Sequence, residues 1–105
     1  MAKKGNHNRL IGFSYEHRFV AALKKKGMKK VKRHYKSMGA TDIDWTDKDG
    51  IQNEAQLKFS TAKLPKMGDK SMEALMRYAK MRSTKKIWLV CKVSRGEETW
   101  TEIVP

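Results

Sequence analysis

The sequence is poor in the residues that build covalent or zinc-based scaffolds. It has one cysteine, so no disulfide can form within one chain. Cys91 lies in the apolar run 87–91, where we expect a packed thiol rather than a nucleophile or a metal ligand. His7, His17 and His34 lack the paired spacing of a zinc site, and we interpret them as surface groups or as contacts to a bound nucleic acid. We therefore expect no zinc.

Acidic residues are also scarce. The chain has 11 Asp and Glu against 24 Lys and Arg, which gives a formal net charge of +13. Positive charge at this density repels itself unless an anionic partner neutralises it. Nucleic acid is the partner that we expect, and a basic ribosomal or merely soluble protein or a protein of anionic membrane surfaces is the alternative. Because no long apolar run, signal peptide or lipidation motif occurs, we expect a cytoplasmic protein without a membrane partner.

Internal repeats, low-complexity tracts and linkers are absent as well. The 105 residues suit one domain with a single modest core. Residues 1–10 are polar and basic without periodicity. We expect them to form a mobile arm that follows a phosphate backbone, and an ordinary disordered terminus is the alternative.

The spacing of apolar residues predicts an α/β fold, in which a central mixed five-stranded sheet is flanked by two helices in the order α-β-β-β-α-β-β. Helices are predicted over 14–26 and 71–82, the second with a core stripe of Met72, Leu75, Met76 and Ala79. Strands are predicted over 28–35, 41–45, 51–59, 87–93 and 100–104, with turns at 36–40 and 47–50 and a loop at 63–68.

Alternation along the predicted hairpin of residues 41–59 separates an apolar face from a polar one. The apolar face carries Ile43, Trp45, Ile51, Ala55, Leu57 and Phe59, and the polar face carries Asp42, Asp44, Gln52, Glu54, Gln56 and Lys58. A hard cation such as Mg²⁺ takes oxygen ligands and can activate water for phosphodiester hydrolysis. The polar face therefore predicts a metal site, at which Lys58 holds the attacking water or the scissile phosphate.

These residues resemble the signature of the PD-(D/E)xK nuclease superfamily. That signature is an acid at the end of one strand and, across a hairpin, an acid-x-Lys segment on the next. Thr41-Asp42 stands at the first half and Gln56-Leu57-Lys58 at the second.

A closer resemblance is to the archaeal and archaeal-viral Holliday junction resolvases. They begin with a basic arm and a Gly-x-x-x-Glu helix start, here Gly12 to Glu16, and their first helix ends in a Leu-x-x-x-Gly pattern, here Leu23 to Gly27. A basic strand, a Ser-Gly turn and an Asp-Ile pair follow, and the residues in those places are Arg33, Ser37, Gly39, Asp42 and Ile43. The match runs from about Lys3 to Ser60, and beyond it only the order of elements agrees.

The resemblance implies a restriction-endonuclease-like fold and a homodimer that cuts four-way DNA junctions. Mg²⁺ would be the metal, with Mn²⁺ able to replace it, and no covalent intermediate or nucleotide cofactor is expected. The implied metal ligands are Glu16, Asp42, Gln56 and the backbone carbonyl of Leu57. Lys58 would position the nucleophilic water and Ser37 would contact DNA near the scissile phosphate. The resemblance also implies an archaeal or viral protein that acts in the host cytoplasm.

Two positions depart from the family pattern. Thr41 replaces a proline whose role is conformational, and Gln56 replaces an acid. An amide oxygen can still bind a hard cation, but the lost charge predicts a lower metal affinity. Asp44 and Glu54 are therefore secondary candidates for metal ligands.

The expected phosphate contacts are cations of the first third of the chain. They are Lys3, Lys4, Arg9, Lys24, Lys25, Lys26, Lys29, Lys30, Lys32 and Arg33, with Ser37 as a further DNA contact. The dimer surface is expected in the apolar later half, with Trp88 or Trp100. Two alternatives stay open: a related nuclease that cuts nicked, flapped or duplex DNA, and a non-catalytic protein that binds nucleic acid and carries its acids as surface groups.

Overall fold

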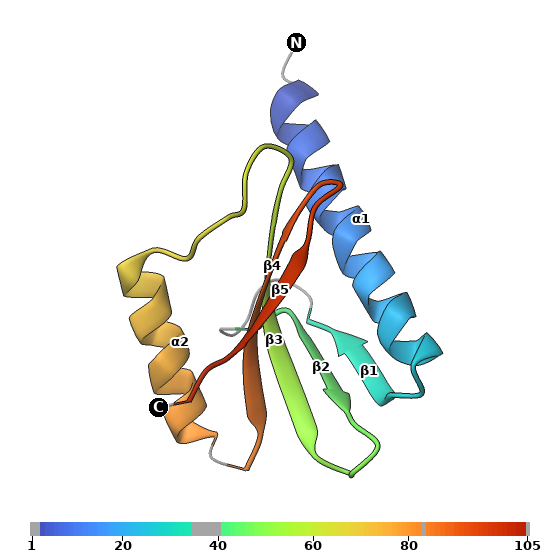
Figure 1. Cartoon of the computed structure of the whole chain (residues 1–105), viewed down its shortest axis with the longest axis vertical. Helices are drawn as coiled ribbons and strands as arrows, with labels where there is room; N and C mark the ends of the chain where they lie inside the picture. The colour runs from blue at the N-terminus through green and yellow to red at the C-terminus, as the bar shows by residue number, and fades with distance from the viewer. Residues whose placement is uncertain (1–2, 35–40, 83, 105) are drawn as a thin grey trace.

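The computed structural model describes residues 3–34, 41–82 and 84–104, and of residues 3–13 only the backbone. Two helices and five strands follow one another in the predicted order (Figure 1). They are α1 (Lys3–Lys25), β1 (Lys29–Arg33), β2 (Ile43–Thr46), β3 (Gln52–Ser60), α2 (Asp69–Met81), β4 (Lys86–Val93) and β5 (Glu98–Glu102). The predicted turn over 36–40, with Ser37 and Gly39, lies outside the described residues.

The five strands form one mixed sheet whose spatial order follows the chain. β3 and β4 are parallel, and the other neighbouring pairs are antiparallel. Parallel neighbours need a crossover, which α2 supplies. Between β2 and β3 the predicted turn is present, because Oδ1 of Asp47 accepts the backbone N–H groups of Asp49 and Ile51. Gly50 allows the positive φ of +79° that this turn requires.

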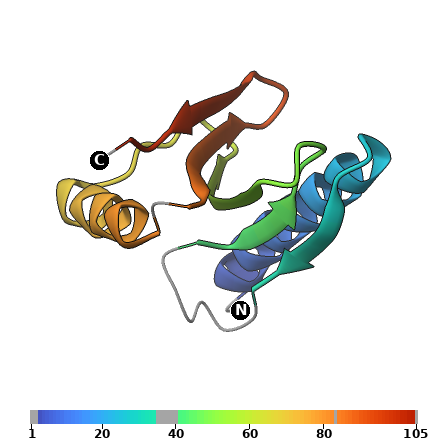
Figure 2. The same ribbon diagram turned by 90° about the horizontal axis from the view of Figure 1, so that it is seen from below.

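Each helix covers one face of the sheet, so the molecule has three layers (Figure 2). The α1 layer buries Tyr15, Phe19 and Leu23 against Ile43, Trp45, Ala55, Leu57 and Val90. The α2 layer buries Leu75 and Ala79 against Ile87, Leu89, Cys91 and Ile103. The strand β4 contributes to both layers, which explains its continuous apolar run. The expectation of a single core is thus wrong, whereas the packed thiol of Cys91 is confirmed.

The first helix is longer than the sequence pattern predicts. It begins at Lys3 rather than at Ser14, and it ends at Lys25. No proline interrupts residues 3–14, and a nucleated helix gains a hydrogen bond with each added residue. Contact of the basic residues Lys3, Lys4 and Arg9 with phosphates stays a prediction, because their side chains are not described.

Two apolar predictions are also wrong in part. Met76 is 41% exposed, because only Leu75 and Ala79 of the predicted stripe face the sheet fully. The last strand ends at Glu102, so Val104 lies beyond it and is 68% exposed. The residue that packs into the α2 layer is Ile103. In the described residues neither helix is long and apolar enough to cross a membrane.

Candidate active site

Asp42 lies just before β2, and the backbone of β3 fixes both its main chain and its carboxylate. Its N–H donates to the carbonyl of Ala55 at 2.8 Å, although Ala55 is also the register partner of Ile43. Two consecutive residues thus face one partner, as in a β-bulge. The carboxylate Oδ2 accepts the N–H of Leu57 at 2.8 Å. The bulge therefore turns Asp42 toward the edge of β3, and simple alternation along the strand does not describe it.

Glu16 approaches Asp42 from α1. Partial burial raises the pKa of the Glu16 carboxyl, and the negative charge of Asp42 raises it further, whereas Arg33 lowers it. The Nε of Arg33 lies 3.5 Å from Oε1 of Glu16. Two carboxylates from different elements are thus close enough to repel each other. A divalent cation between them would relieve that repulsion.

Lys58 supplies positive charge to the same place. Burial raises the pKa of Asp42, and the hydrogen bond from Leu57 and the charges of Lys58 and His34 oppose that rise. Lys58 is half-buried and pairs in register with Cys91 of β4. Asp42 is thus coupled electrostatically to Glu16 of α1 and to Lys58 of β3. That the three residues form one catalytic site stays a prediction.

The neighbouring oxygen donors suit a hard cation. Gln56 precedes Leu57 on β3 and is half-buried. The Leu57 carbonyl points to the same edge as its N–H, because both groups of a strand residue face one neighbouring strand. Carboxylate, amide and carbonyl oxygens are the ligands of Mg²⁺ rather than of a soft metal. In the described residues no three His, Cys, Asp or Glu side chains gather closely enough to hold a metal ion by themselves.

Glu54, a secondary candidate ligand, is committed to the fold instead. It is 3% exposed, and its carboxylate accepts hydrogen bonds from Thr41 at 2.5 Å, Tyr78 at 2.6 Å and Lys85 at 2.8 Å. Burial would raise its pKa, but the donors Lys85, Thr41 and Tyr78 lower it below the ordinary value. We do not retain Glu54 as a metal ligand, because protein donors occupy both of its oxygens.

Asp44, the other secondary candidate, pairs with His34. The Nε2 of His34 contacts Oδ2 of Asp44, and its Nδ1 lies 2.9 Å from the carbonyl of Thr41. Burial would lower the pKa of His34, but the bonds to Thr41 and Asp44 raise it overall. The ring is half-buried and bonded at both nitrogens, and a contact of His34 with nucleic acid stays a prediction. Asp44 is likewise dropped as a ligand.

Thr41 has a role that proline cannot fill. Its side chain is 1% exposed and donates to Glu54, while its carbonyl contacts His34. Threonine in place of proline therefore adds a hydrogen-bond donor that links the segment before β2 to Glu54 and, through it, to Tyr78 of α2. No local pattern predicts this network, because Tyr78 and Lys85 lie 24 and 31 residues from Glu54.

The predicted DNA contacts fall into three groups. Lys24, Lys25, Lys26, Lys29, Lys30 and Lys32 are exposed, as phosphate contacts must be. Arg33 is half-buried and engaged by Glu16 and by His17, so it also orients an acid of the site. Ser37 lies outside the described residues, and its role at the scissile phosphate stays a prediction.

Comparison with known proteins adds evidence on the fold. No family model matches this sequence, and no curated protein matches it significantly. A solved structure that is similar is that of Hjc from Archaeoglobus fulgidus, a Holliday junction resolvase from an archaeal hyperthermophile. The TM-score is 0.69 over 88% of this chain and 72% of the other, with 15% sequence identity.

The chain has a restriction-endonuclease-like fold. The order of two helices and five strands in a mixed sheet agrees with that of the resolvase, which confirms the predicted architecture. A fold of this kind hosts many functions, so the chemistry depends on the site residues rather than on the architecture.

Proposed function

We propose that this chain is a metal-dependent, structure-selective DNA endonuclease that resolves four-way junctions as a homodimer. One observation supports the proposal: the charge of Asp42 acts on Glu16, and that of Lys58 on Asp42, in a fold shared with a Holliday junction resolvase. Any one of these residues alone has an ordinary structural explanation. Together, two acids and a lysine that interact electrostatically match the residue types that metal-dependent phosphodiester hydrolysis needs.

Mg²⁺ fits the donor set, and Mn²⁺ would fit it as well. Glu16, Asp42, Gln56 and the carbonyl of Leu57 would hold the ion, which would neutralise phosphate charge and lower the pKa of a bound water. The protein keeps those ligands in place: Arg33 holds the Glu16 carboxylate, and the Leu57 N–H holds that of Asp42. The ammonium of Lys58 would orient the water and stabilise the negative charge that develops on the phosphate.

Binding would draw on the positive charge of the whole chain. With +13 charges, contacts to about six to ten phosphates would lower the affinity about 10³–10⁵-fold between low and moderate salt. Such contacts position the DNA without reading its sequence. Selectivity for a junction would then come from shape rather than from base recognition.

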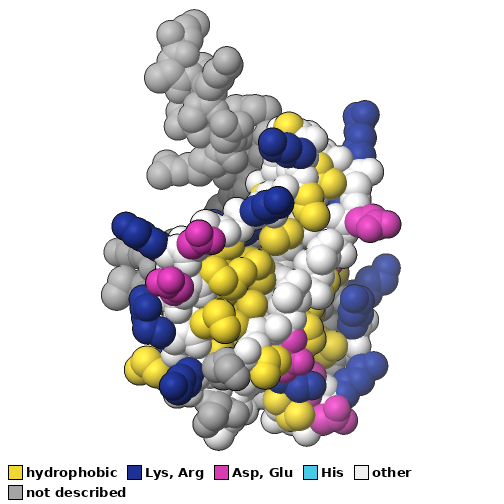
Figure 3. Space-filling model, turned by 60° about the vertical axis from the view of Figure 1, so that its left-hand side comes forward, with side chains coloured by type: hydrophobic (Ala, Val, Ile, Leu, Met, Phe, Trp, Pro, Cys, Tyr) yellow, Lys and Arg dark blue, Asp and Glu magenta, His cyan; other side chains and the backbone are white. Residues whose placement is uncertain are grey.

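Two nicks related by symmetry need two active sites at a fixed separation, and a two-fold dimer supplies them. Leu64, Met76, Met81 and Val104 are large apolar side chains that are 41–75% exposed. Apolar side chains gather on the side of the molecule where α2 lies (Figure 3). By contrast, Trp88 and Trp100 pack into the α1 layer. We therefore propose the α2 side, rather than the two tryptophans, as the dimer surface.

The decisive experiment compares wild type and Asp42→Asn on a labelled four-way junction and on a linear duplex of the same sequence, with Mg²⁺ or with EDTA. We expect paired nicks in the junction only with wild type and Mg²⁺. Equal cutting of both substrates would instead indicate a nuclease for other DNA. Binding without any cleavage, unchanged by the substitution and by every divalent metal tried, would identify a non-catalytic DNA-binding protein.

A further inference from the structure

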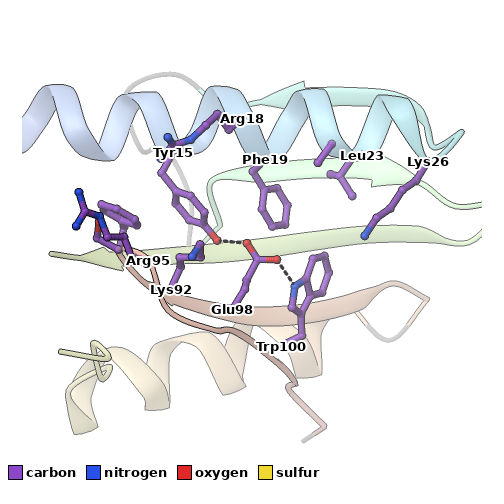
Figure 4. A pocket seen from close by; sticks show the side chains of 12 residues that line it. Tyr15, Arg18, Phe19, Leu23, Lys26, Lys92, Arg95, Glu98 and Trp100 are labelled. Carbon is purple, nitrogen blue, oxygen red and sulfur yellow. Dashed lines mark hydrogen bonds between the residues drawn. The ribbon is translucent and has the colours of Figure 1, made fainter. Parts of the chain in front are cut away.

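A hollow of about 430 Å³ opens between α1 and the β4–β5 hairpin, in the layer opposite α2 (Figure 4). Its volume lies in the range of about 300–1,000 Å³ that ligand sites occupy. It is lined by Tyr15, Arg18, Phe19, Ala22, Leu23, Lys26, Phe59, Lys92, Ser94, Arg95, Glu98 and Trp100. None of these residues belongs to the proposed catalytic set. The proposed nuclease chemistry therefore does not account for this hollow.

Aromatic rings form its floor in a fixed arrangement. Trp100 stacks on Phe19 with ring centroids 5.2 Å apart, and Tyr15 stacks on Phe59 at 5.1 Å. Glu98 holds two of these rings, because it accepts hydrogen bonds from the Tyr15 hydroxyl at 2.7 Å and from the Trp100 indole at 2.8 Å. The rings are thus oriented before any ligand arrives. Rigid aromatic surfaces of this kind suit a flat partner.

Cations surround that floor. Arg95 lies at one end of the hollow and Lys26 at the other, and Arg18 and Lys92 also line it (Figure 4). Glu98 is the acid among the lining residues, and both of its oxygens already accept hydrogen bonds. An anionic ligand with a flat apolar part therefore matches both the charge and the shape.

Arg95 is placed at the rim at a conformational cost. Its φ is +62°, in the left-handed region that favours glycine. The adjacent Gly96 packs so closely that an added Cβ would lie 2.2 Å from Cγ1 of Val93. Strain of this kind is retained where the surrounding structure or a function holds it. Here the strained residue is Arg95, whose cationic side chain lines the hollow.

A second hollow of about 320 Å³ shares Leu23, Lys26 and Trp100 with the first. It adds Trp45 and Trp88 to the aromatic lining and Lys86 to the cations, against the acid Asp47. The two hollows are neighbours, because they share Leu23, Lys26 and Trp100, and we name the pair the aromatic groove.

We propose that the aromatic groove binds unpaired nucleotides of a single-stranded nucleic acid. The bases stack on the half-buried rings of Phe59 and Trp100, which the buried rings of Tyr15 and Phe19 support. The phosphates meet Arg18, Lys26 and Arg95. This site goes beyond the proposed nuclease function and does not depend on it. It gives the protein a second contact to nucleic acid, specific for strands whose bases are not paired.

The test uses the three tryptophans, all of which line the groove. Oligothymidylate of about ten nucleotides is titrated into the whole protein in EDTA at constant salt, and the tryptophan fluorescence is followed. We expect saturable quenching. An abasic oligonucleotide of the same length, which has phosphates but no bases, should bind at least about tenfold more weakly. Equal affinity for both strands would overturn the proposal.

Matched variants locate the site. Arg18→Ala with Arg95→Gly removes two rim cations, and Arg77→Ala with Lys80→Ala removes two exposed cations of α2. We expect about tenfold weaker binding for the first pair and less than about threefold for the second. Equal losses would mean non-specific attraction. Loss of a dimer in the first pair, seen by sedimentation, would instead assign the groove to a second copy of the chain.

Two results keep this proposal separate from the nuclease. Asp42→Asn should bind oligothymidylate as tightly as wild type, because Asp42 does not line either hollow. Failure of junction cleavage would leave the fluorescence titration in EDTA unchanged. Failure of the titration would equally leave cleavage to be judged by its own assay.

Discussion

The backbone N–H of Leu57 donates to Oδ2 of Asp42 at 2.8 Å, so the strand that carries Gln56 and Lys58 also orients the acid across from it. The pairing of β2 with β3 therefore sets the separation of the proposed ligands. A change of charge at Gln56 should act on the metal without moving Asp42.

Gln56→Glu should strengthen metal binding, because it adds a charged oxygen to the two proposed acidic ligands, Glu16 and Asp42. We expect the Mg²⁺ concentration for half-maximal cleavage to fall about tenfold, and calorimetry with Mn²⁺ should show the same direction. Gln52→Glu is the matched control, since Gln52 is exposed at the start of the same strand. If both variants lower the metal requirement equally, Gln56 is not a ligand.

Glu54→Gln should destabilise the fold by about 2 kcal/mol, because a buried carboxylate with three donors becomes an amide that cannot satisfy them equally. Unfolding in urea at pH 7 measures the change. The exposed Glu73 of α2 supplies the comparison, and Glu73→Gln should stay within about 0.5 kcal/mol of wild type. A similar small effect for Glu54→Gln would show that the network does not stabilise the fold.

Low pH should remove the stability that the ionised carboxylate of Glu54 contributes to the fold. Its pKa in the folded protein lies below the ordinary value of 4.5, so its stabilisation is complete above that value and is lost as the pH falls through the folded-state pKa. The raised pKa values of Glu16 and Asp42 act in the opposite direction. The difference in unfolding free energy between wild type and Glu54→Gln isolates Glu54. It should shrink below about pH 4, and a difference independent of pH would contradict the assignment.

Local patterns in the sequence were enough for most of the architecture. Tyr15, Phe19 and Leu23 recur at helical spacing and are buried together, and the continuous apolar run of β4 lies between two helical layers. Asp42 and Lys58 were found because a hairpin brings near neighbours in sequence together. Each of these inferences needed only a period or a turn.

Features that depend on distant segments escaped sequence reasoning. The bulge at Asp42 breaks the alternation from which the direction of its side chain was predicted. No residue type at this position indicates a bulge. The bond from Tyr15 to Glu98 spans 83 positions, so the aromatic groove exists only after β5 has joined the sheet. Burial of Glu54 likewise depends on the crossover that returns Lys85 to β3. Tertiary contacts, rather than local propensity, decide these positions.

A charge in the apolar patch of the α2 side should abolish the dimer. Met81 is 75% exposed and Met76 41% exposed, so Met76→Lys with Met81→Lys alters the surface with little effect on the core. We expect a monomer in analytical ultracentrifugation, and single nicks in place of paired nicks in the junction. Ala21→Lys, on the exposed side of α1, should leave the dimer unchanged. A wild-type protein that is already monomeric would refute the dimer proposal itself.

Arg95→Gly should stabilise the protein by about 0.5–1 kcal/mol, because glycine adopts the φ of +62° without the strain of a side chain. Thermal and urea unfolding measure the gain. Glu97→Gly, in the same turn but without a positive φ, should instead lose about 0.5 kcal/mol through the greater freedom of the unfolded chain. A variant of Arg95 that is more stable and yet binds oligothymidylate more weakly would show that the arginine is retained for its charge. Weaker binding together with lower stability would point to a damaged hairpin instead.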